Sequence, residues 1–108
     1  MPTEKWSDKI VVVHLADDPQ FTEDLEGVGG LMKRDVSIVL DFAGVRYVNS
    51  SNISQLLKLR KQLISTDARL VLCNVNTQVW GVFLITGLDK IFEFADNLFT
   101  ALATLQME

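Results

Sequence analysis

The chain has 108 residues, 48% of them hydrophobic and 22% charged, and this balance is typical of one globular domain over residues 1–108. Its formal net charge of −4 argues against a nucleic-acid partner, because affinity for nucleic acid comes from Lys and Arg side chains that neutralise phosphates. One cysteine excludes an internal disulfide, and one histidine leaves little of the usual acid–base repertoire.

The N-terminal residues are polar, and no apolar run approaches the roughly 20 residues that a membrane-spanning helix needs. Without a signal peptide or a membrane span, we expect a cytoplasmic protein of bacterial type. Residues 1–8 are polar apart from Trp6, and they are expected either to form a short edge strand or to stay irregular.

A short, β-branched run over residues 10–15 predicts the first strand of the core. His14 lies in that run and is interpreted as an ordinary packed residue. A helix is predicted over residues 21–34, with Thr22 as its N-cap, because apolar residues recur there at helical spacing: Phe21, Leu25, Val28, Leu31 and Met32.

Three glycines, Gly27, Gly29 and Gly30, lie inside this predicted helix, and each costs about 1 kcal/mol relative to alanine. They could be read as a phosphate-binding loop, but no strand leads into them and no Lys-Ser/Thr pair follows. The favoured interpretation is a weak helix that lies close to another backbone segment.

A nearly continuous apolar run over residues 36–40 predicts a strand covered on both faces, with Asp41 at its carboxyl end and a turn at Gly44. After a short extended segment, 45–48, come four small polar residues, which we name the cap segment: Asn49, Ser50, Ser51 and Asn52. Helical periodicity then runs from 53 to 64.

Two interpretations of the cap segment remain open. Asn52 is predicted to be the N-cap of the helix, with Gln55 completing a variant capping box, and Ser50 or Ser51 could also serve as plain caps. Alternatively a serine is a phosphate acceptor, because a helix N-terminus stabilises added negative charge.

The remaining elements follow the same alternation. Residues 69–73 predict a strand in which Cys73 is a small buried hydrophobe, and Asn76 or Thr77 is expected to cap a helix that Gly87 ends. Residues 91–94 predict a final short strand, and the last helix is expected to be capped by Asp96 or Asn97 and to carry Leu98, Phe99, Leu102 and Leu105. This order predicts an α/β fold with a mixed, mostly parallel sheet and about four helices.

No catalytic constellation accompanies these elements. The chain contains no nucleophile elbow, no dinucleotide fingerprint and no P-loop, and its one histidine lies far in sequence from Ser50 and Ser51. We therefore predict a recognition or regulatory domain rather than an enzyme, with no cofactor and no metal. Trp80 lies off the apolar stripe of its helix, and it is expected to pack inside or, if exposed, to anchor a partner.

Four segments have a distinctive order and spacing: DFAGV at 41–45, YVNSSNI at 47–53, LVLCNV at 70–75 and LITGLDKIF at 84–92. Together they resemble the STAS domain family, of the bacterial anti-sigma-factor antagonist type. The resemblance implies a single STAS-like α/β domain that regulates transcription by partner switching. Its implied partners are an anti-sigma-factor serine kinase, which phosphorylates the antagonist, and a serine phosphatase, which reverses the modification.

The resemblance places the modified serine at Ser51. It implies that partners contact the start of the helix, which we extend to six residues of this chain: Asn49, Ser50, Ser51, Asn52, Ser54 and Lys58. The protein is expected to be a monomer or a homodimer.

The chain departs from the family motif at two positions, because Asn49 replaces its Asp and Asn52 replaces its Gly. These changes suit a helix start and weaken the case for recognition by a kinase. The alternative prediction is therefore a STAS scaffold that is not phosphorylated, as a subunit of a larger signalling or lipid-transport complex. A small enzyme or ligand-binding domain is disfavoured by the missing catalytic groups.

Overall fold

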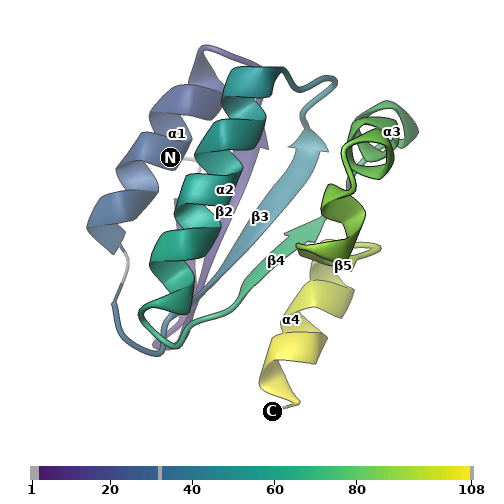
Figure 1. The fold of residues 1–108 in the computed structure, drawn as a ribbon. Coiled ribbons are helices and arrows are strands. Elements are labelled where there is room, and N and C mark those ends of the chain that lie inside the picture. Colours follow the sequence, from purple (N-terminus) through teal and green to yellow (C-terminus); the bar gives the residue numbers. More distant parts are fainter. Residues whose placement is uncertain (1–2, 32, 108) are drawn as a thin grey trace.

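The computed structural model describes residues 3–31 and 33–107. Its strands are β1 (Thr3–Ser7), β2 (Ile10–Ala16), β3 (Ser37–Gly44), β4 (Leu70–Cys73) and β5 (Glu93–Ala95). Its helices are α1 (Gln20–Val28), α2 (Ser50–Ile64), α3 (Thr77–Ile85) and α4 (Leu98–Gln106), with short 3₁₀ turns at Gly29–Leu31 and Leu88–Lys90. The predicted α/β architecture, a mixed sheet with four helices, is confirmed (Figure 1).

The five strands form one sheet in the order β1-β2-β3-β4-β5. The edge strand β1 pairs antiparallel with β2, and every later pair is parallel. Each parallel connection carries a helix, as crossover connections require. As a result the loops that precede α1, α2 and α3 all lie at the carboxyl edge of the sheet.

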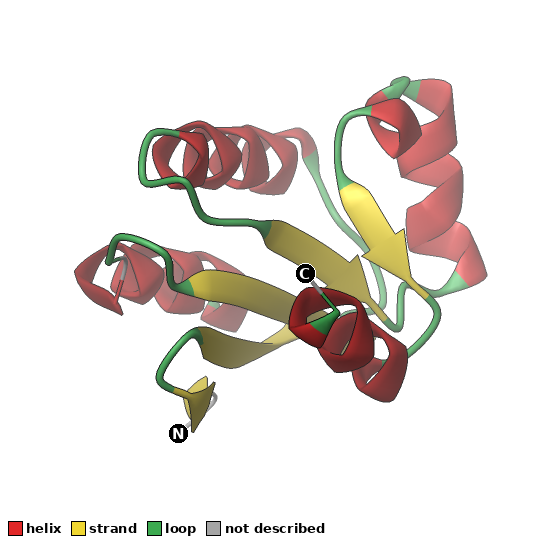
Figure 2. Cartoon of the chain, turned by 90° about the horizontal axis from the view of Figure 1, so that it is seen from below, coloured by secondary structure: helices red, strands yellow, loops and turns green. Residues whose placement is uncertain are grey.

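The strand residues alternate between two apolar layers. Val13, Leu40 and Leu72 point into the larger core, which α1, α2 and α3 cover. Val12, Val39 and Val71 are register partners on the opposite face, where they pack against α4. Figure 2 shows α4 on one side of the sheet and the other three helices on the other side.

The first helix differs from its prediction. It begins at Gln20, and Pro19 rather than Thr22 is its N-cap residue; it ends at Val28, well before Arg34. The glycines explain the early end, because the chain leaves the α-helix at Gly29 for a 3₁₀ turn. The expected close backbone neighbour is also wrong, since an added Cβ at Gly27, Gly29 or Gly30 would meet nothing within 4 Å. The predicted position of Met32 in this helix lies outside the described residues.

Two strands also differ from their predicted bounds. β3 continues to Gly44, where an added Cβ would lie 2.8 Å from the backbone oxygen of Leu15, so close strand packing rather than a turn requires this glycine. β5 starts only at Glu93, because a 3₁₀ turn precedes it and leaves Ile91 exposed. Residues 45–48 form no regular element, although Val45 is buried.

Other local predictions are confirmed. Residues 3–7 form the short edge strand, and Cys73 is fully buried. Asn76 caps α3, Asn97 caps α4, and Gly87 follows α3 with a φ of 75° in the left-handed region. Trp80 is half-buried and packs edge-on against Phe94, with ring centroids 4.9 Å apart.

Candidate partner-binding site

The cap segment begins α2 earlier than predicted. Asn49 is the N-cap residue, in an extended conformation, and its side-chain oxygen accepts a hydrogen bond of 2.8 Å from the Asn52 backbone N–H. The Asn52 side-chain oxygen in turn accepts one of 3.1 Å from the Asn49 N–H. The predicted box of Asn52 with Gln55 is therefore wrong by one turn, because Asn49 already satisfies the helix end.

The carboxylate of Asp18, in the loop between β2 and α1, holds this helix start in place through hydrogen bonds. The Asn52 amide group donates to Asp18 Oδ2 at 2.9 Å, and both the N–H and the hydroxyl of Thr22 donate to Asp18 Oδ1, at 2.9 and 2.7 Å. Hydrogen bonds from Asn52 and then Thr22 hold the pKa of Asp18 below its usual value. Thr22 thus helps to join the starts of α1 and α2 instead of capping α1 alone.

Neighbouring loops are tied to the same edge of the sheet. The Arg46 guanidinium donates to Asp17 Oδ2 at 2.7 Å, and its backbone N–H donates to Asp17 Oδ1 at 2.8 Å. The hydrogen bonds from Arg46 lower the pKa of Asp17. On the other side, the Asn76 amide donates to the Val45 carbonyl oxygen at 3.0 Å. The loop before α2 is thus held from both sides.

Most of the predicted partner-binding residues lie together on the surface. Asn49, Ser50, Ser51, Ser54 and Lys58 are exposed over the first turns of α2. Asn52 is 2% exposed and faces inward, so its contribution is to hold the helix end rather than to touch a partner.

Neither serine acts as the cap. In the described part of the chain, no hydrogen bond uses the hydroxyl of Ser50 or Ser51, which occupy the first two positions of the helix. Their side chains therefore lie at the positive end of the helix dipole without a structural task of their own.

Sequence reasoning missed two residues of this surface. Tyr47 is 51% exposed in the loop before α2, and the side chain of Arg46 beside it is largely exposed. Tyrosine and arginine are enriched among the residues that dominate binding energy at interfaces. Both residues directly precede the cap segment in the sequence, and this position could have indicated that they belong to the same surface.

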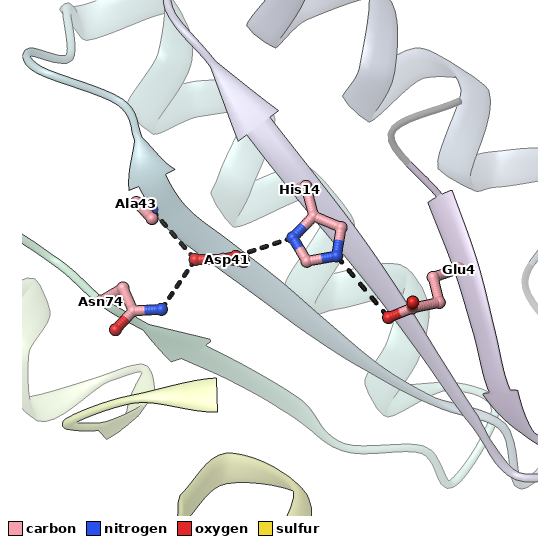
Figure 3. A network of polar contacts seen from close by, with 5 residues as sticks. All are labelled: Glu4, His14, Asp41, Ala43 and Asn74. Atoms are coloured by element: carbon pink, nitrogen blue, oxygen red, sulfur yellow. Dashed lines mark hydrogen bonds and ion pairs between the residues drawn. The ribbon is translucent and has the colours of Figure 1, made fainter. Parts of the chain in front are cut away.

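A second polar cluster lies on the α4 side of the sheet (Figure 3). His14 Nδ1 lies 2.7 Å from Asp41 Oδ2, and His14 Nε2 lies 3.7 Å from Glu4 Oε1. Asp41 Oδ1 also accepts from the Ala43 N–H at 3.0 Å and the Asn74 amide at 2.9 Å. His14 lies within β2 as predicted, but its side chain is 41% exposed and bonds across the strands instead of packing among apolar residues.

This cluster is a structural network. Burial opposes ionisation of Asp41, but the hydrogen bonds from Asn74, Ala43 and His14 outweigh it and lower the pKa of Asp41. Burial, and then the charge of Asp41, raise the pKa of Cys73 to about 12, which keeps that thiol protonated. In the part of the chain that the structure describes, no three His, Cys, Asp or Glu side chains are placed to hold a metal ion.

Within residues 3–31 and 33–107, none of the helices has the length and apolar character needed to traverse a bilayer.

Comparison with known proteins gives this surface a family context. A family model described as the STAS domain matches residues 7–104. BtrV of Bordetella bronchiseptica, which is named as an anti-sigma factor antagonist, is 32% identical over 74 residues, or 68% of this chain. The matched region spans only 64% of that relative's length.

Solved structures agree on the fold. An anti-sigma factor antagonist protein of Thermotoga maritima superposes with a TM-score of 0.80 at 18% identity, over 97% of this chain and 93% of that one. The antagonist SpoIIAA, solved in its unphosphorylated form, gives a TM-score of 0.64 at 17% identity, over 89% of this chain and 87% of that one. The chain therefore belongs to the STAS domain family, and the relatives it resembles are of the anti-sigma-factor antagonist type.

Proposed function

We propose that this protein is an anti-sigma-factor antagonist that binds an anti-sigma serine kinase through the start of α2 and is switched by phosphorylation of Ser51. One observation carries the proposal: Ser51 is an exposed hydroxyl at the second position of α2, in a helix start that other residues hold in place. The relationship to proteins named as antagonists supports the choice of partner class.

The geometry suits a switch that leaves the fold intact. Asn49 and Asn52 exchange hydrogen bonds at the start of α2, and the Asn52 amide also donates to Asp18. A phosphate on Ser51 would displace none of these bonds. Phosphorylation adds about −1.5 to −2 charge near neutral pH, and the helix N-terminus stabilises that charge. A partner packed against this surface would instead meet a bulky anion, and the complex would weaken.

The two departures from the family motif, Asn49 and Asn52, are compatible with this proposal. Asn49 supplies a neutral oxygen where the motif has a carboxylate, and Asp18 supplies a carboxylate from the adjoining loop. Asn52 turns its side chain inward, so the position of the motif glycine stays open to a partner. Both features therefore favour a partner-binding surface at the start of α2.

The proposal also covers the location, the domain organisation and the partners of the protein. The protein acts in the cytoplasm as a single domain over residues 1–108, it catalyses no reaction itself, and a serine phosphatase restores the binding form. Its partners contact Asn49, Ser50, Ser51, Ser54 and Lys58, and the exposed Tyr47 widens that surface.

Intact-mass analysis tests the modification. The protein is incubated with ATP, Mg²⁺ and the anti-sigma serine kinase encoded nearest to its gene, and one phosphate is expected on the wild type. Ser51→Ala should abolish the gain in mass. Ser54→Ala removes another exposed serine of the same helix and should leave the gain intact. A phosphate at another residue, or none with a kinase shown to be active, would contradict the proposal.

A second function is favoured by the neutral cap segment itself. With Asn at both flanking positions, the chain could serve as a constitutive STAS subunit of a larger signalling or lipid-transport complex. That function predicts a stable complex on co-purification with light scattering, unchanged by Ser51→Ala and by Ser51→Glu alike. The switch predicts a complex that Ser51→Glu disrupts.

A further inference from the structure

A groove lies between α1 and α2, which run side by side over the larger core (Figure 1). Its volume is about 260 Å³, and the buried side chains of Leu25 and Leu59 form its floor. The rest of its lining is exposed or half-buried: Glu26, Gly29, Gln55, Lys58 and Gln62. This α1–α2 groove is therefore apolar at its base and polar or charged along its walls.

The α2 wall of the groove is continuous with the proposed switch. Ser51, Gln55 and Lys58 are spaced by four and three residues, so they follow one another along one side of α2. The Gln55 amide donates to the Thr22 hydroxyl at 3.1 Å, and the Gln55 side-chain oxygen accepts from the Asn52 amide at 3.4 Å. A partner that covers Ser51 therefore reaches the groove along the same helix face.

The two walls of the groove carry opposite charges. Every charged side chain of α1 is acidic, and every charged side chain of α2 is basic. Glu26 lines the groove from α1 and Lys58 lines it from α2, and among the described residues neither side chain forms an ion pair. A partner segment complementary to this groove carries the reverse arrangement, with a cation toward α1 and a carboxylate toward α2.

Gly29, on the α1 wall, has no structural role inside the chain. Its backbone is ordinary and helical, with φ −53° and ψ −35°, and a Cβ added there would meet nothing within 4 Å. Neither its conformation nor its packing requires glycine, although glycine weakens a helix. A residue without a side chain lets another backbone approach closely. Since no described part of this chain makes that approach, the wall at Gly29 is open to a partner.

We propose that the α1–α2 groove receives a segment of the anti-sigma serine kinase, with a basic side chain of that partner at Glu26 and an acidic one at Lys58. This inference rests on the proposed function and extends the partner-binding surface from α2 to α1. Ser51 precedes Lys58 by seven residues, about 10 Å along the helix axis, which is close to the screening length in about 0.1 M salt. A phosphate on Ser51 then repels the same carboxylate that Lys58 attracts.

Calorimetry with the anti-sigma serine kinase tests this proposal, with ADP in place of ATP so that Ser51 stays unmodified. Glu26→Lys should weaken binding by about tenfold or more, because it turns attraction at the α1 wall into repulsion. Glu23→Lys makes the same charge change on the same helix and is the matched control. Glu23 is exposed but does not line the groove, so this variant should bind as the wild type does.

Gly29→Leu tests the close approach separately. Its added side chain enters open space, so the variant should unfold at or above the temperature of the wild type. It should nevertheless bind the kinase about tenfold more weakly or worse, because the leucine occupies the place of the partner. Gly30→Leu makes the same change one residue later, outside the groove lining, and should bind as the wild type does.

The outcomes separate this proposal from the switch. If Ser51→Glu weakens binding while Glu26→Lys and Gly29→Leu bind as tightly as the wild type, the groove proposal is overturned and the switch stands. Equal losses with Glu23→Lys and Glu26→Lys would also overturn the groove, since they would reflect overall charge. A wild type that does not bind the kinase overturns both proposals.

Discussion

Single side chains decide whether the start of α2 can act as a switch. Asp18, from a different loop, accepts hydrogen bonds from Asn52 and Thr22 and so holds the helix end without using a serine. The sequence singled out the cap segment, but it could not identify Asp18, because that contact spans 34 residues and depends on how the loops meet. The same limit hid the bond between His14 and Asp41, which spans 27 residues.

The Asp18 network predicts a pH dependence. In the folded protein the pKa of Asp18 lies below its ordinary value of 3.8. The ionised Asp18 carboxylate therefore contributes stability above pH 3.8, and this contribution is lost as the pH falls through the lower pKa of the folded state. Urea unfolding at about pH 6 should find Asp18→Asn less stable than the wild type, and the gap should narrow at about pH 3. A gap that stays constant across this range would argue against an ionised Asp18 at the cap.

The Asp41 network predicts a graded loss of stability. Asp41 is 7% exposed and accepts from three donors, so Asp41→Ala removes three part-buried hydrogen bonds to a charged acceptor and should cost about 2–4 kcal/mol in urea unfolding. Asp41→Asn keeps the size and one acceptor oxygen, and it should cost less. Equal stability of the wild type and Asp41→Ala would show that the network contributes nothing.

At the scale of elements, periodicity predicted the order of strands and helices, and local geometry set their ends. The stripe through Phe21 and Leu25 correctly indicated α1, but its glycines ended the helix early, at Val28. Residues 91–94 alternate like a strand, yet a 3₁₀ turn at Leu88–Lys90 precedes them and β5 starts only at Glu93. These boundaries depend on backbone hydrogen bonds that a one-dimensional pattern does not specify.

Two glycines should respond in opposite ways to alanine. Gly44→Ala places a Cβ 2.8 Å from the Leu15 oxygen, a backbone atom that cannot turn away, and should destabilise the fold by about 1–3 kcal/mol. Gly27→Ala lies within α1 with open space around it and should stabilise by about 0.5–1 kcal/mol. Thermal unfolding of both variants provides the measurement. The packing account fails if Gly44→Ala is as stable as the wild type.

At the scale of the molecule, the sheet separates two surfaces. One side carries α2 and the proposed switch, and the other carries α4 (Figure 2). The resemblance in four segments predicted the family, which the match over residues 7–104 bears out. The exposure of Phe99 could not be predicted, because this residue fitted the expected apolar pattern of α4 and only the structure places it outward.

The central claim is that charge at Ser51 controls binding to a kinase. Calorimetry with the anti-sigma serine kinase should give Ser51→Ala the affinity of the wild type, while Ser51→Glu should bind about tenfold more weakly or worse, because it sets an uncompensated charge into the interface. Ser54→Glu, one turn along the same exposed face, is the control for charge alone and should weaken binding less. If Ser51→Glu binds as tightly as the wild type, the switch is contradicted.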